Sequence, residues 1–98
     1  MVKHVILWRL KDSVNDVQSV KKGIKTGLEG LAGIIDGLVS VRVITDGLPS
    51  SNADLMLDTT FRDADALKNY ANHPAHLAVA NAKVRPFVET RLCLDYQE

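Results

Sequence analysis

The amino-acid sequence predicts an α+β domain in which helices cover one face of a four-stranded antiparallel sheet. Three observations carry this prediction. Apolar residues alternate near both ends of the chain, an amphipathic helical pattern follows the first strand, and a second helical region is interrupted at Pro74. The 98 residues suffice for a single domain, residues 1–98, with a modest core.

The first predicted strand covers residues 2–10. Its side chains alternate, with His4, Ile6 and Trp8 on one face and Val5 and Leu7 on the other. Because both faces are apolar in the middle of the strand, we expect it to lie centrally in the sheet.

The first predicted helix begins at residues 13–16, which resemble a capping box, and runs to about Gly33. Apolar side chains at spacings of three and four give it one buried stripe. Glycines in the same stretch either permit close packing or leave space beside the helix. The stripe is Val17, Val20, Ile24, Leu28 and Leu31, and the glycines are Gly23, Gly27 and Gly30.

Two further strands are predicted at residues 38–46 and 53–61, joined by a turn-rich connection. On the earlier of these strands, the pattern places Val39, Val41 and Val43 on one face. On the later strand, it places Leu55, Leu57 and Phe61 together.

The second helical region has two parts. Asp63 can cap a short helix that buries Ala64, Leu67 and either Tyr70 or Ala71. Pro74 suits the first turn of the next helix, which continues towards residue 86, because a missing N–H needs no partner there. A final strand is predicted at about residues 89–96.

The order of elements is therefore β-α-β-β-α-β, the ferredoxin-like arrangement. Helices on one face leave the other face bare, and we expect Ile6 and Trp8 to lie on that bare face. An exposed apolar patch of this kind indicates an association surface. The predicted assembly is a homodimeric α/β barrel in which two bare faces meet and each half encloses a pocket.

Composition excludes several classes of function. Twelve basic and twelve acidic residues cancel, so no basic stripe indicates binding to nucleic acid. No apolar run approaches the roughly 20 residues that span a bilayer, and no signal peptide is recognisable, so we expect a cytoplasmic protein without a membrane partner. Cys93 is the single cysteine and cannot form an internal disulfide.

Residues 70–76, Tyr-Ala-Asn-His-Pro-Ala-His, concentrate two of the three histidines at the helix corner. His73 precedes proline at a helix boundary, and a capping role is the favoured interpretation for its ring. His76 lies one turn into the helix and could act as an acid or base, with Tyr70 donating to a carbonyl or enolate oxygen. A satisfied pocket or core histidine remains the alternative.

A metal site would require His73, His76 and an approach by His4, with no further ligand evident at a typical spacing. We therefore expect no metal and no cofactor. Cys93 has only Arg91 as a basic neighbour in sequence, which gives little support for a nucleophile.

Taken together, several segments resemble the stress-responsive dimeric α/β-barrel (Dabb) family across essentially the whole chain. They are residues 1–11, Phe61, residues 70–76 and residues 94–96. The resemblance implies a homodimeric barrel. One branch of the family is a plant polyketide cyclase that performs an intramolecular aldol condensation without cofactor or metal.

By resemblance to that cyclase, His76 matches the catalytic base and Tyr70 its hydroxyl partner. His4 matches a pocket residue, and Asp95 matches the carboxylate that orients the base. The chain departs from the cyclase in two ways: the first helix lacks pocket aromatics around residues 23–28, and Trp8 adds bulk. These departures make a long hydrophobic polyketide a poor match.

Two functions follow. The first is a stress-responsive barrel homodimer that binds a small organic ligand in an interior pocket, with no assigned reaction. The alternative is a cofactor-independent enzyme that catalyses proton transfer or aldol-type cyclisation of a β-keto substrate, with His76 as base and Tyr70 as oxyanion donor. The pocket residues expected in either case are His4, Ile6, Trp8 and Asp95.

Overall fold

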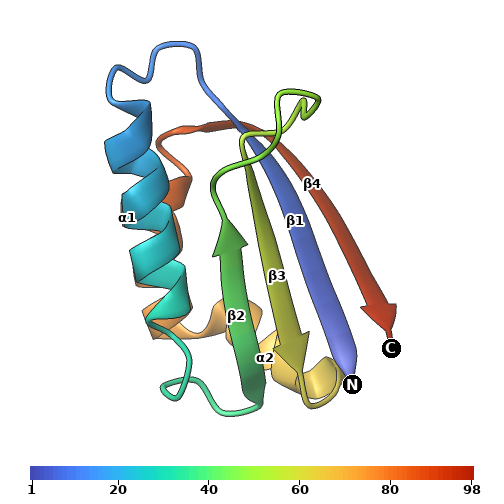
Figure 1. Cartoon of the computed structure of the whole chain (residues 1–98). Helices are drawn as coiled ribbons and strands as arrows, with labels where there is room; N and C mark the ends of the chain where they lie inside the picture. Colours follow the sequence, from blue (N-terminus) through green and yellow to red (C-terminus); the bar gives the residue numbers. More distant parts are fainter.

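A computed structural model describes residues 1–98 and shows helices packed on one face of a four-stranded antiparallel sheet (Figure 1). The strands lie in the order β2-β3-β1-β4, so β1 is central as predicted. The strands are β1 (Val2–Leu10), β2 (Leu38–Ile44), β3 (Leu55–Phe61) and β4 (Val88–Gln97). The helical elements are α1 (Val17–Glu29), α2 (Ala64–Asn72), α3 (Pro74–Val79) and the π-helical turn η1 (Ala80–Val84). The ferredoxin-like prediction is confirmed.

Helix α1 is shorter at both ends than the sequence predicted. Asp16 itself caps the helix, because its carboxylate accepts a hydrogen bond of 3.0 Å from the backbone N–H of Ser19. At the other end the chain leaves the helix after Glu29 and turns through Gly33, whose φ of +82° is the left-handed conformation that glycine tolerates.

The glycines of α1 serve close packing at one position. A methyl group at Gly27 would lie 2.9 Å from Cγ1 of Val79, so the missing side chain lets α1 approach α3. At Gly23 the nearest group would be the flexible Lys83 side chain, at 3.8 Å. Of the two alternatives raised by the sequence, close packing therefore holds at Gly27.

Strand β2 departs from simple alternation. Its register against β3 shifts between Leu38 and Ser40, and this bulge turns Val39 outward, where it is half exposed. Val43 is buried in the core and Val41 packs against it, so these two share a face as predicted. The prediction for Val39 was wrong because periodicity cannot reveal an extra residue in a ladder.

The side of the sheet assigned to Ile6 and Trp8 was also wrong. Both side chains belong to the core beneath the helices, where Trp8 is 3% exposed and Ile6 is 4% exposed. The bare face instead carries Val5 and Leu7, which pair across the ladder with β4. Strand β1 is apolar on both sides, and the bulkier residues lie on the side that the helices bury.

The caps and the break at Pro74 form as the sequence predicted, but α2 buries Ala66 and Tyr70 and leaves Ala64 exposed. Asp63 caps α2 by accepting a 2.8 Å hydrogen bond from the Ala66 N–H, and His73 caps α3 because its Nδ1 accepts a 3.0 Å hydrogen bond from the Ala75 N–H. After α3 the helix widens into η1, where the Arg85 N–H donates to the Ala80 carbonyl. None of the helices combines the length and apolar character needed to cross a membrane.

Candidate functional site

A cavity of about 440 Å³ lies between the helix-covered face of the sheet and the segment from α2 to β4. Its wall is mostly apolar, with a polar set formed by a phenol, an imidazole, two guanidinium groups and one carboxylate. An apolar cavity with a few converging polar groups is typical of a small-molecule site. The polar set is Tyr70, His76, Arg85, Arg91 and Glu89.

Tyr70 is buried at the inner wall of this cavity. Its ring packs edge-on against Phe61, with centroids 5.0 Å apart, and lies against the ring of His76 at 4.2 Å. Its hydroxyl is inaccessible and has no hydrogen-bond partner in the protein. Burial raises the pKa of Tyr70 to about 12, so the phenol stays protonated and can donate a hydrogen bond.

His76 is half-buried in the first turns of α3. Its Nδ1 lies 3.3 Å from the carbonyl oxygen of Ala71. Since a carbonyl only accepts, this contact assigns the proton to Nδ1 and leaves the Nε2 lone pair free. Burial lowers the pKa of His76, and the positive charges of Arg85 and Arg91 lower it further. The neutral imidazole is therefore the prevailing form near neutral pH.

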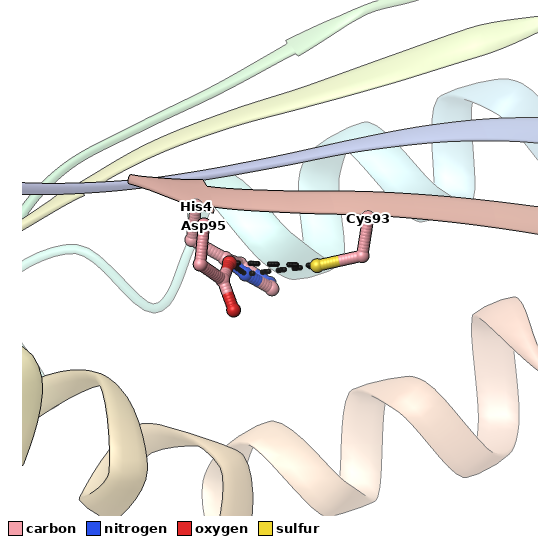
Figure 2. A group of neighbouring side chains, drawn as sticks. All are labelled: His4, Cys93 and Asp95. Carbon is pink, nitrogen blue, oxygen red and sulfur yellow. Dashed lines mark hydrogen bonds and ion pairs between the residues drawn. The ribbon is translucent and has the colours of Figure 1, made fainter. Parts of the chain in front are cut away.

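A second group of side chains links β1 to β4 (Figure 2). His4 lies directly opposite Asp95 in the ladder, and the His4 Nδ1 is 2.5 Å from the Asp95 Oδ1. Cys93 precedes Asp95 by two residues and projects from the same face, with its Sγ 3.6 Å from the His4 Nδ1 and 3.4 Å from the Asp95 Oδ1. The proximity of Cys93 to His4 was not among the sequence predictions, because it depends on the pairing of β1 with β4.

This group corrects one implication of the family resemblance. Asp95 was expected to orient His76, but its carboxylate contacts His4, and the partner of the His76 Nδ1 is the backbone of Ala71. The reason is the β1–β4 register, which places Asp95 across from His4 on the sheet.

The predicted site residues divide into two sets. Tyr70, His76 and Trp8 line the cavity, whereas His4, Ile6 and Asp95 are not among its lining residues. His4 still lies nearby, because its ring centroid is 6.2 Å from that of Tyr70.

Three charged cavity residues, Arg85, Glu89 and Arg91, were not among the predicted site residues. Arg91 shares the alternation of the last strand with Cys93 and Asp95, and this parity was the available signal for it. Arg85 follows η1, whose widened turn leaves no periodic signal in the sequence.

The two histidines of the helix corner have separate local roles. His73 uses its Nδ1 to cap α3, while His76 faces the cavity. Burial and the adjacent Asp95 carboxylate raise the pKa of the Cys93 thiol, which disfavours the thiolate that a nucleophile requires.

Comparison with known proteins finds both a similar sequence and similar structures. The chain is 33% identical over 87 residues to an uncharacterized protein of Streptomyces coelicolor, covering 80% of this chain and 81% of that protein. A dimeric ferredoxin-like protein of unknown function from Bacteroides fragilis is 29% identical, with a TM-score of 0.91. The match covers 99% of this chain and 95% of that protein.

A hydroxynitrile lyase from Passiflora edulis is 21% identical, with a TM-score of 0.80 and coverage of 97% of this chain and 90% of the lyase. At that identity the likeness concerns the fold alone. The profile of the stress responsive A/B barrel domain matches residues 2–98. With its sheet order, its helix corner and this match, the chain belongs to the stress responsive A/B barrel (Dabb) family.

Proposed function

We propose that this protein is a homodimer in which each protomer binds a small organic ligand in the cavity beside Tyr70 and His76. The buried Tyr70 hydroxyl carries the proposal. A hydroxyl without a partner costs about 1–3 kcal/mol, and a ligand oxygen that accepts its hydrogen bond would remove this cost.

The cavity also indicates the chemistry of the ligand. Trp8, Leu28 and Leu57 provide an apolar wall, which favours a hydrocarbon or aromatic body. Arg85 and Arg91 outnumber the single carboxylate of Glu89, which favours an acidic group on the ligand. A small keto acid combines these features, with its carbonyl oxygen accepting from Tyr70.

The dimer is proposed to form through the bare face of the sheet. This face carries exposed apolar side chains on neighbouring strands, and the similar protein from Bacteroides fragilis is described as dimeric. Two such faces packed together would bury the apolar groups and form the barrel. The exposed side chains are Leu7, Leu92 and Leu94.

Calorimetric titration with small β-keto acids, followed by NMR mapping, tests the ligand proposal. We expect saturable binding that perturbs Tyr70, His76 and Trp8. A panel of acids and of their reduced hydroxy analogues separates recognition of the carbonyl from recognition of the charge. Perturbations confined to surface residues outside the cavity would refute the proposal.

A second candidate function is catalysis without a cofactor, and the free Nε2 of His76 favours it. In this mechanism Nε2 removes the proton between two carbonyl groups of a β-keto substrate, and Tyr70 donates a hydrogen bond to the resulting enolate oxygen. The carbanion then attacks a second carbonyl carbon of the same molecule and forms a C–C bond. The new alkoxide recovers the proton from the imidazolium.

His76→Ala distinguishes the two candidates. If His76 is the base, the variant should lose turnover of a cyclisable β-keto substrate by roughly 100-fold or more while its melting temperature changes little. His73→Asn, which keeps a capping oxygen at the helix corner, serves as the matched control and should retain turnover. Turnover that survives in His76→Ala would rule out this mechanism and leave ligand binding.

A further inference from the structure

The side chains of His4, Cys93 and Asp95 form a compact group on the inner face of the sheet, apart from the residues that line the cavity. Each offers one donor atom, and the three atoms lie within 4.8 Å of one another. In Figure 2 all three side chains project from β1 and β4 towards the side on which the helices lie. The group combines nitrogen, sulfur and oxygen donors on two adjacent strands.

We propose that His4, Cys93 and Asp95 bind a divalent transition metal ion of the zinc class. A thiolate and an imidazole are preferred ligands of Zn²⁺, whereas Mg²⁺ and Ca²⁺ select sets made of oxygen atoms. With the carboxylate, the set supplies three protein ligands. One position of a tetrahedral site is then left for solvent or a bound molecule.

The donor spacing matches such a site with little movement. In a tetrahedral zinc site with ordinary bond lengths, a sulfur ligand lies about 3.5 Å from its nitrogen or oxygen neighbours. The Cys93 Sγ lies 3.6 Å from the His4 Nδ1 and 3.4 Å from the Asp95 Oδ1. Only the His4–Asp95 separation of 2.5 Å must open, to about 3.3 Å.

The three side chains differ in exposure, and this difference supports a site that is preformed but accessible. The His4 side chain is 9% exposed and is held by its place in the central strand, so its ring is positioned before binding. Cys93 is exposed and the Asp95 side chain is 47% exposed, which gives the ion a path and lets the carboxylate move. A bound ion would link the edge strand β4 to the central strand β1.

The test uses the full chain, freed of metal by a chelator and kept reduced. Co²⁺ is titrated by absorption and Zn²⁺ by calorimetry. We expect one ion per chain, with the near-ultraviolet charge-transfer band of a cobalt–thiolate bond, and a higher melting temperature when Zn²⁺ is present. Absence of stoichiometric binding or of the thiolate band would overturn the proposal.

Substitutions locate the ion. Cys93→Ser and Asp95→Asn change exposed positions and should leave the fold intact by circular dichroism. Loss of a group that merely supports a ligand weakens metal affinity roughly 10- to 100-fold. Cys93→Ser removes a ligand itself, so we expect its metal affinity to fall by at least about 100-fold and its cobalt spectrum to lack the thiolate band.

His73→Asn is the control, since it removes an imidazole outside the group. It should bind both ions like the wild type. Undiminished affinity in Cys93→Ser, or loss of binding in the control, would place the ion at other histidines and overturn the proposal. Neither result bears on ligand binding at Tyr70, so the two proposals fail independently.

Discussion

The carboxylate of Asp95 lies 2.5 Å from the Nδ1 of His4, directly across the β1–β4 ladder. The Nδ1 of His76 instead lies 3.3 Å from the Ala71 carbonyl oxygen. We therefore predict that Asp95→Asn leaves the NMR titration of the His76 ring unchanged. His76→Gln identifies the resonance and provides the control. A clear shift of the His76 titration in Asp95→Asn would show that the carboxylate governs His76 after all.

Tyr70→Phe should separate function from stability. Removal of a buried hydroxyl that has no partner is expected to leave the free energy of unfolding unchanged or to raise it by about 1 kcal/mol. Ligand affinity should fall roughly fivefold to tenfold, the equivalent of one hydrogen bond. Urea unfolding and calorimetric titration measure the two effects.

Tyr96→Phe is the matched control for Tyr70→Phe, because Tyr96 is an exposed tyrosine of β4. It should alter neither quantity. A loss of several kcal/mol of stability in Tyr70→Phe would mean that the hydroxyl is needed for the fold.

The lowered pKa of His76 predicts a dependence of stability on pH. Burial disfavours the charged ring, so between the folded pKa and the ordinary value of 6.5 the unfolded state binds more protons. The contribution of His76 to stability is present above 6.5 and is lost as the pH falls through the folded pKa. As the pH falls across this range, the urea midpoint of unfolding should decline less steeply for His76→Gln than for the wild type. Parallel curves would contradict the assignment.

Leu94→Asp should convert the dimer into a folded monomer. Leu94 is 65% exposed on the bare face, and an aspartate there would be buried without a partner at the interface. Light scattering coupled to size exclusion measures the change. Ile34→Asp, at an equally exposed apolar position in the turn after α1, should remain dimeric. A monomeric wild type would refute the barrel.

Trp8→Asp should have a different effect from Leu94→Asp. Since Trp8 is 3% exposed in the core, Trp8→Asp should unfold the protomer itself, at a cost of several kcal/mol, rather than yield a folded monomer.

Two glycines of α1 form a natural pair for a stability test. Gly23→Ala should stabilise the protein by up to about 1 kcal/mol, because alanine favours the helix and its methyl group would make only an ordinary contact of 3.8 Å with the Lys83 side chain. Gly27→Ala places its methyl group 2.9 Å from Val79, so strain against α3 should offset this gain. Thermal unfolding compares the variants, and equal stabilisation by both would contradict the close packing of α1 on α3.

Local features of the fold were predictable from the sequence because they depend on neighbours along the chain. The caps of Asp63 and His73 are examples, since each side chain bonds a backbone N–H two or three residues away. The bulge at Val39 was not predictable, because an extra residue in a ladder is defined only by the strand opposite it.

The sequence by itself determined the order of the elements, the family and the helix corner that carries Tyr70 and His76, because periodicity and capping act over a few residues. The tertiary structure alone decided which side of β1 meets the helices, and that Asp95 contacts His4 across 91 residues of chain. An apolar strand such as β1 can bury either face. The choice, and the register that follows from it, depends on packing against distant segments, which no local pattern encodes.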